Sequence, residues 1–189
     1  SSVTIAEPTA LVASSVVNTN VSCNGGSDGS ATASVTGGTT PYSYLWSNAA
    51  TTASITGVVA GTYTVTITDA NNCTSVASTT ITEPLVLSAS AVNTNVSCNG
   101  GSDGSATASG TGGATPYNYL WSNAATTVSI TGVSSGTYTV TVSDANSCTS
   151  TSSVTITEPT ALVASSGVNT AVSCNGGSDG SATASVTGG

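Results

Sequence analysis

Residues 61–73 read GTYTVTITDANNC, and this stretch decides the fold class. Tyr63, Val65 and Ile67 alternate with threonines, so in an extended chain the apolar side chains share one face and the hydroxyls share the other. A period of two, built from β-branched and aromatic residues, predicts a half-buried β-strand with a solvated threonine face. The Asp-Ala-Asn-Asn run that follows is typical of a tight turn, because Asp and Asn accept turn backbone conformations at modest cost.

This stretch belongs to a repeat that fills the chain. It returns 75 residues later as GTYTVTVSDANSC at 136–148, and the segment VSCNGGSDGSATAS begins at Val21, Val96 and Val172. Solenoid units run from roughly 20 to 50 residues and cannot bury a core alone, so a unit of this length predicts an independent domain.

The repeat predicts four segments. Residues 1–8 match the end of the second copy and are interpreted as the last strand of a preceding repeat. Two complete copies follow, and the remaining residues carry the first strands of a truncated third copy. The predicted boundaries are 1–8, 9–84, 85–159 and 160–189.

Other stretches of the repeat also alternate. Ser30 to Thr36 places Ala31, Ala33 and Val35 on one face, and no stretch shows the 3.6-residue period of a helix. Glycine-rich turns separate these runs, which gives six or seven short strands per copy. We therefore predict an all-β protein of tandem immunoglobulin-like β-sandwich repeats.

Each complete copy holds two cysteines, 50 residues apart, that bracket one tryptophan. The order Cys, Trp, Cys resembles immunoglobulin-like sandwiches, in which the Trp packs on an intradomain disulfide. A zinc or redox site is the alternative, but the chain has no His and no Cys-x-x-Cys pair. Disulfides predict an extracellular or periplasmic setting. The predicted pairs are Cys23–Cys73 and Cys98–Cys148, with Cys174 bonded to a cysteine beyond Gly189.

The charge composition excludes several classes of function. The chain has no Lys, Arg or His, and its eight carboxylates give a formal net charge of −8. Nothing in it can neutralise phosphate, so nucleic acid is not expected as a partner. No run of about 18 apolar residues occurs, so direct membrane insertion is not expected. A serine nucleophile would lack its usual base, so we do not expect an enzyme.

The motifs together carry a family resemblance. In order they are the CNGGSDGS turn, the GG-x-x-PY-x-Y-x-W strand, the SITG-x-x-x-G-x-Y turn and the T-D-A-N-x-C close, with Ser143 replacing the Thr of the last motif in the second copy. This order resembles the SprB-type repeat of very large surface adhesins of gliding Bacteroidota. The resemblance implies secretion to the outer cell surface by the type IX route, with the repeats forming a long filamentous shaft.

Two groups of side chains are candidate sites. Asp28, Asp69 and Asn71, with their equivalents Asp103, Asp144 and Asn146, would form a weak calcium site if their loops shared one end of the sandwich. A turn-stabilising role is favoured, since Asp in such turns usually bonds its own backbone, and no other cofactor is expected.

The large aromatic residues have two candidate roles. A chain without Phe or Met needs them in its cores, and a sugar-stacking platform is the alternative. The predicted core aromatics are Trp46, Trp121, Tyr42, Tyr44, Tyr63, Tyr117, Tyr119 and Tyr138.

Two function classes remain from the sequence. The first is a structural shaft of an extracellular adhesin for attachment or gliding, in which each repeat contacts its neighbours in the same chain. The second is a laterally packed fibre or sheath of identical chains, or repeats that bind surface polysaccharide themselves. Near-identity of the copies favours the shaft, because an element that provides reach gains from number and needs no distinct site.

Overall fold

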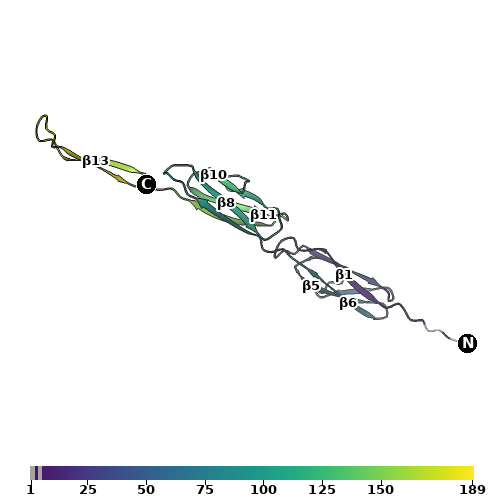
Figure 1. The fold of residues 1–189 in the computed structure, drawn as a ribbon. Helices are drawn as coiled ribbons and strands as arrows, with labels where there is room; N and C mark the ends of the chain where they lie inside the picture. The colour runs from purple at the N-terminus through teal and green to yellow at the C-terminus, as the bar shows by residue number, and fades with distance from the viewer. Residues whose placement is uncertain (1–2, 4–5) are drawn as a thin grey trace. The chain divides into compact units, whose positions relative to one another are not determined.

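A computed structural model describes residue 3 and residues 6–189, and every regular element in them is a β-strand. None of the described residues forms a helix that could cross a membrane. The chain divides into two compact units (Figure 1). Unit 1 is Ser1–Leu87 with Thr111–Pro116 and Asp144–Cys148, and unit 2 is Ser88–Gly110, Tyr117–Ser143 and Thr149–Gly189. The strand predicted at 1–8 includes residues 1–2 and 4–5, which lie outside the described residues.

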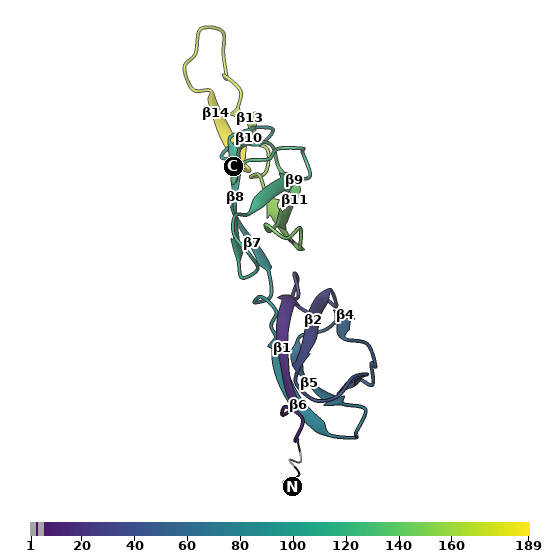
Figure 2. The same ribbon diagram turned by 90° about the vertical axis from the view of Figure 1, so that its right-hand side faces the viewer.

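Unit 1 contains two three-stranded antiparallel sheets, in the orders β1-β2-β4 and β3-β5-β6 (Figure 2). Its strands are β1 (Val12–Thr19), β2 (Gly29–Thr36), β3 (Ser43–Trp46), β4 (Ser54–Val58), β5 (Gly61–Thr68) and β6 (Thr74–Ile81). The alternation predicted around Tyr63 and Ala31 is confirmed, since both runs lie in strands with buried apolar positions.

A core fills the space between these sheets, which confirms a sandwich. Trp46 is 1% exposed and Ile67 is fully buried, and the Trp46 indole N–H donates to the Thr52 carbonyl at 2.9 Å. Small alanines of β2 face them, because a large side chain there would not fit between the sheets. The buried members are Val21, Ala31, Ala33, Trp46, Ile55, Tyr63, Val65, Ile67 and Ile81.

Strand direction decides where the loops lie. Ala13 N donates to Ser75 Oγ at 3.0 Å near the beginning of β1 and β6, and Val21 N donates to Thr82 O at 2.9 Å beyond their ends. The two strands therefore run in the same direction. The pairings β1 with β2 and β2 with β4, and β6 with β5 and β5 with β3, then make β3 and β4 run that way too. The chain crosses from one sheet to the other between β3 and β4 without reversing.

The second copy builds its strands in the same way, and its core is formed by the equivalent residues, except that Val154 is buried where the first copy has Thr79 and Tyr138 is only partly buried. Its strands are β7 (Ser88–Thr94), β8 (Gly104–Thr111), β9 (Asn118–Trp121), β10 (Ser129–Val133), β11 (Gly136–Ser143) and β12 (Thr149–Ile156). The third copy contributes the hairpin β13 (Val163–Thr170) and β14 (Ser181–Thr187).

The predicted intradomain disulfides are wrong. Cys23 follows the end of β1, whereas Cys73 precedes the start of β6, so the two lie at opposite ends of the sandwich. A strand of eight residues spans about 26 Å, and a disulfide requires Cα atoms within about 7 Å. Cys23 bonds Cys148 instead, with Cα atoms 5.7 Å apart. Cys73, Cys98 and Cys174 are free and exposed, so the pair Cys98–Cys148 is also excluded.

Candidate functional site

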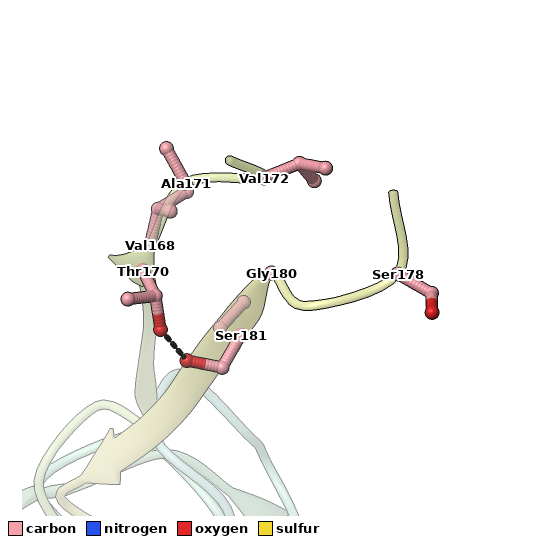
Figure 3. Close-up of a pocket in the computed structure, with 8 residues that line it drawn as sticks. Val168, Thr170, Ala171, Val172, Ser178, Gly180 and Ser181 are labelled. Carbon is pink, nitrogen blue, oxygen red and sulfur yellow. Dashed lines mark hydrogen bonds between the residues drawn. The ribbon is translucent and has the colours of Figure 1, made fainter. Parts of the chain in front are cut away.

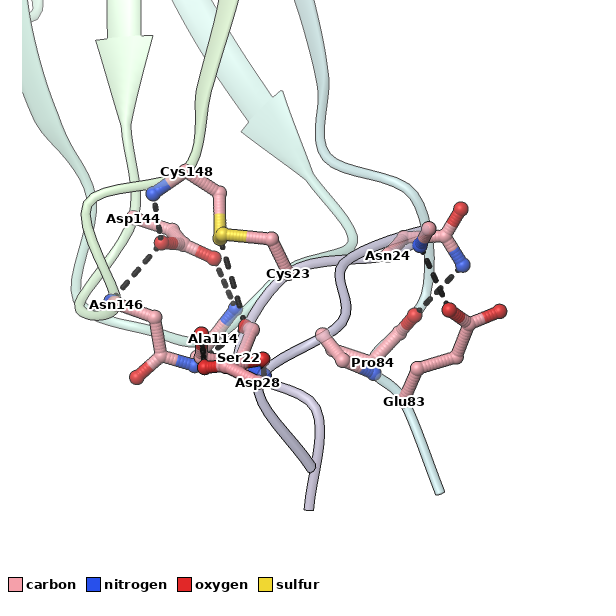
Figure 4. Close-up of a disulfide and its surroundings, with 11 residues drawn as sticks. Ser22, Cys23, Asn24, Asp28, Glu83, Pro84, Ala114, Asp144, Asn146 and Cys148 are labelled. Carbon is pink, nitrogen blue, oxygen red and sulfur yellow. Dashed lines mark hydrogen bonds between the residues drawn. A yellow bond between two sulfur atoms is a disulfide. The ribbon is translucent and has the colours of Figure 1, made fainter. Parts of the chain in front are cut away.

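The site is a cluster in unit 1 that surrounds the Cys23–Cys148 disulfide, and we call it the junction (Figure 4). It joins a residue of the first sequence copy to a residue of the second. Its members come from the loop between β1 and β2, from the Glu83-Pro84 pair, from the segment after β8 and from the turn between β11 and β12. They are Ser22, Cys23, Asn24, Asp28, Glu83, Pro84, Ala114, Asp144, Asn146 and Cys148.

The loop at residues 20–28, which we call the cysteine loop, is shaped by Asp28. Its Oδ1 accepts the Ser22 backbone N–H at 3.0 Å, and its Oδ2 accepts the Ser22 hydroxyl. The Ser22 hydroxyl is the main cause that lowers the pKa of Asp28, followed by the Ser22 backbone N–H. Asp103 binds Ser97 and Asp179 binds Ser173 in the same way, so this loop forms alike in all three copies.

The Glu-Pro pair is held against the cysteine loop. Gly25 N donates to Glu83 Oε2 at 2.6 Å, and Asn24 Nδ2 donates to the Pro84 carbonyl at 3.0 Å. Proline also restricts the residue before it, so this connection has little conformational freedom. The short Glu-Pro segments predicted from the sequence are therefore tied to the loop that carries the cysteine.

The turn Asp144–Cys148, which we call the aspartate turn, supplies the other half. Asp144 is 3% exposed; its Oδ1 accepts the N–H groups of Asn146 and Cys148, and its Oδ2 accepts that of Ala114, all at 2.9 Å. The Ala114 N–H is the main cause that lowers the pKa of Asp144. Gly113 has φ of 58°, and a Cβ there would lie 2.5 Å from Asp144 Oδ2, so only glycine fits.

The cysteine loop and the aspartate turn contact each other at three points. Besides the disulfide, Asn146 Nδ2 donates to the Ser22 carbonyl at 2.8 Å, and Cys148 Sγ lies 3.4 Å from that oxygen. Figure 4 shows Asn146 and Cys148 next to Ser22. The junction is therefore a specific backbone contact in addition to a covalent bond.

The turn-stabilising role predicted for the aspartates is confirmed. Asp69 repeats the Asp144 pattern, accepting the N–H groups of Asn71, Cys73 and Thr39 at 2.9 Å. The condition for a calcium site, that the loops of Asp28, Asp69 and Asn71 share one end of a sandwich, is not met, because these loops lie at opposite ends. The same holds for Asp103 and Asp144. Within the described residues no group of three His, Cys, Asp or Glu side chains gathers to hold a metal.

The predicted core role of the aromatics is confirmed for the buried members. Trp46, Trp121 and Tyr63 are at most 9% exposed, which removes both tryptophans from any surface platform. The other tyrosines are partly buried against the two cores: Tyr42, Tyr44, Tyr117, Tyr119 and Tyr138.

A hollow of about 410 Å³ lies on the β13–β14 hairpin and offers only apolar and hydroxyl groups (Figure 3). Its Val172 and Ala182 correspond to Val21 and Ala31, which are buried in the first copy. The hollow is thus the core-facing side of the hairpin, with no group that suggests chemistry.

Fold and site together define a class: a tandem β-sandwich repeat protein in which a disulfide joins one sequence copy to the next. A family model described as the SprB repeat matches residues 15–51 and 90–126. The chain thus carries two SprB repeats, one in each complete copy. The matches include the CNGGSDGS turn and the aromatic strand, and they end before the other two motifs named above. No curated protein matches the chain.

Several solved structures are similar at low identity. A C-terminal 282-residue fragment of intimin, in complex with the intimin-binding domain of the translocated intimin receptor, has 15% identity and a TM-score of 0.39, covering 84% of this chain and 67% of that one. The N-terminal four Ig domains of Dscam1 isoform 6.9 have 15% identity and a TM-score of 0.35, covering 82% and 48%. A tetra-tandem repeat from the extending region of a large adhesion protein has 15% identity and a TM-score of 0.28, covering 94% and 63%. Likeness at this level carries no functional argument.

Sequence reasoning found the cysteines and aspartates but missed the junction. It assigned no role to Ser22 or Asn24 and considered Asn146 only as a calcium ligand, whereas the contacts of all three cross between loops far apart in the chain. The signal that points to the true pair is strand direction. Because β3 and β4 run the same way, the two cysteines of one copy fall at opposite ends.

Proposed function

We propose that this chain is a segment of the shaft of a long extracellular adhesin, in which disulfide-joined β-sandwich repeats provide length. The observation that carries the proposal is the Cys23–Cys148 bond, which connects successive sequence copies. A protein whose copies act separately gains nothing from such a bond, whereas one that bears tension along its length does.

Three further observations support the shaft. The Glu83-Pro84 connection is hydrogen-bonded to the cysteine loop, and the same contacts recur at Glu158 and Pro159. Disulfides persist in oxidising compartments, which favours the cell surface. The two SprB repeats agree with a surface adhesin. For this shaft we also propose secretion by a type IX route in a gliding bacterium of the Bacteroidota, the setting that the resemblance implies.

A laterally packed fibre or sheath of identical chains is the second candidate. Apolar side chains stand exposed at equivalent positions of both copies: Leu45 is 55% exposed and Leu120 is 53% exposed. Identical copies would present these residues at regular intervals along a chain. Such a pattern suits contact between parallel neighbours, although single exposed apolar residues are common on monomers.

Imaging of the native filament by cryo-electron microscopy separates the two candidates. The shaft predicts a cross-section of one chain, with one sandwich at each level of the filament. Several chains in each cross-section, with Leu45 and Leu120 at their contacts, would show that the fibre is correct. As a matched check, replacing both leucines with Ser should leave a single-chain shaft unchanged and should disperse a fibre.

A further inference from the structure

The three free cysteines occupy positions equivalent to the two halves of the junction. Cys73 ends an aspartate turn, as Cys148 does, and Cys98 and Cys174 lie in cysteine loops, as Cys23 does. Each free cysteine is therefore of one type or the other, and only Cys73 is of the aspartate-turn type.

Around Cys73 the aspartate-turn half is already formed. Asp69 holds the turn through three backbone N–H groups, and Gly38, with φ of 65°, takes the place that Gly113 takes in the junction. A hollow of about 220 Å³ opens beside the thiol. The lining is Glu7, Pro8, Thr9, Ala10, Leu11, Gly38, Asp69 and Cys73. The second copy has the same residue at each equivalent position except two, where Leu85 and Val86 replace Thr9 and Ala10.

Around Cys98 the cysteine-loop half of the junction is formed without a disulfide. Asn99 Nδ2 donates to the Pro159 carbonyl at 3.1 Å, and Gly100 N donates to Glu158 Oε2 at 2.7 Å, as Asn24 and Gly25 do in the first copy. The difference lies in exposure: Ser22 and Cys23 are half-buried, whereas Ser97 and Cys98 are exposed. The shape of the loop does not depend on the disulfide, and the disulfide partner is what covers it.

We propose that the hollow at Cys73 is a docking site for the cysteine loop of another copy of this repeat, closed by a disulfide. The occupant is defined by the junction itself, where Ser22 and Cys23 sit against the equivalent turn. The rule that follows is a ladder: the first cysteine of each copy bonds the second cysteine of the next, and no copy bonds within itself. This inference deepens the proposed shaft and rests on it for its biological meaning.

The bond can be tested by thiol–disulfide exchange with a peptide. The probe is VSCNGGSDG, the sequence of residues 21–29, with its cysteine held as a mixed disulfide with thionitrobenzoate. The Cys73 thiolate attacks the peptide cysteine sulfur, a new disulfide forms, and thionitrobenzoate leaves as a coloured thiolate. No other oxidant is needed, because one disulfide bond forms as another breaks and thionitrobenzoate leaves with the electron pair of the broken bond.

The readout is the ratio of rates for this peptide and for a scrambled peptide at each cysteine. The full chain is used with Cys23–Cys148 intact, and Cys73→Ser, Cys98→Ser and Cys174→Ser variants assign the sites. We expect a ratio of at least about 10 at Cys73, the factor given by about 1.4 kcal/mol of docking free energy, and a ratio near 1 at the other two. Because each ratio compares two peptides at the same cysteine, differences in intrinsic reactivity among the three thiols cancel.

Equal ratios at all three cysteines would overturn the proposal. So would an unchanged ratio at Cys73 for a peptide that has Asn in place of its aspartate and lacks the serine before its cysteine. A failed peptide test with single-chain filaments in the images would leave the shaft standing and remove the ladder. A positive peptide test with multi-chain filaments would support the ladder and remove the single-chain shaft.

Discussion

At the scale of residues, the loops of this protein depend on carboxylates that accept backbone N–H groups. Asp69 and Asp144 are almost fully buried, and each connects the turn after a long strand to the loop before a tyrosine-bearing strand. With no Lys, Arg or His in the chain, no cation stands opposite them. The hydrogen bonds alone stabilise the charged form, which lowers both pKa values from 3.8.

Part of the pH dependence of stability follows from these two aspartates. A folded-state pKa below the unfolded value contributes stability that is present above the unfolded pKa and is lost as pH falls through the folded one. We expect the melting temperature to stay level from pH 8 to about 5 and to fall below about 4. Asp69→Asn with Asp144→Asn should lower it by several degrees at pH 7 and flatten the acid fall.

Protonation also relieves repulsion among the eight carboxylates, which acts in the opposite direction. Scanning calorimetry of the wild type and the double variant across this range separates the two effects. Parallel curves would show that these aspartates do not carry the acid sensitivity.

The chain contains a matched pair of asparagines for testing the junction. Asn146 donates to the Ser22 carbonyl, whereas Asn71 occupies the same turn position and donates to Thr39 Oγ1 at 3.0 Å. Asn146→Ala should shift the glutathione equilibrium of the Cys23–Cys148 bond toward the thiols by roughly two- to tenfold, the value of one hydrogen bond. Asn71→Ala should leave it unchanged. An equal shift in both variants would mean that the contact to Ser22 does not stabilise the bond.

At the scale of elements, the strand faces follow from the sequence because burial imposes a period of two. The run from Thr62 to Thr68 shows this directly, with Val65 and Ile67 fully buried between outward threonines. The period of two does not reveal the direction in which each strand runs. The crossing between β3 and β4 carries the chain to the other sheet without a reversal, and this single feature places Cys73 away from Cys23.

Each hydrophobic core is built from residues of one copy, so neither depends on the disulfide. Reduction should therefore leave the fluorescence of Trp46 and Trp121 blue-shifted and resistant to quenchers. Trp46→Ala is the contrasting variant, because truncating a buried Trp costs about 3–5 kcal/mol and should unfold the first sandwich. A red shift of both tryptophans on reduction alone would mean that the bond holds the sandwiches together internally.

At the scale of the whole molecule, the repeat is readable from the sequence, whereas the cysteine pairing is not. In a repeated sequence every cysteine has an equivalent in each copy, so spacing alone allows pairing within a copy or across copies. The order Cys, Trp, Cys favours the first, and the structure has the second. The disulfide is therefore a connection between successive copies and is not internal to one domain.

The pairing can be read from one digest of the intact, non-reduced chain after its free thiols are alkylated. A protease that cleaves before aspartate cuts at Asp28, Asp69, Asp103, Asp144 and Asp179. Mass spectrometry should find residues 1–27 linked to 144–178, with alkyl groups on Cys73, Cys98 and Cys174. Linkage of 1–27 to 69–102 and of 69–102 to 144–178, with Cys174 alone alkylated, would contradict the cross-copy disulfide and the shaft built on it.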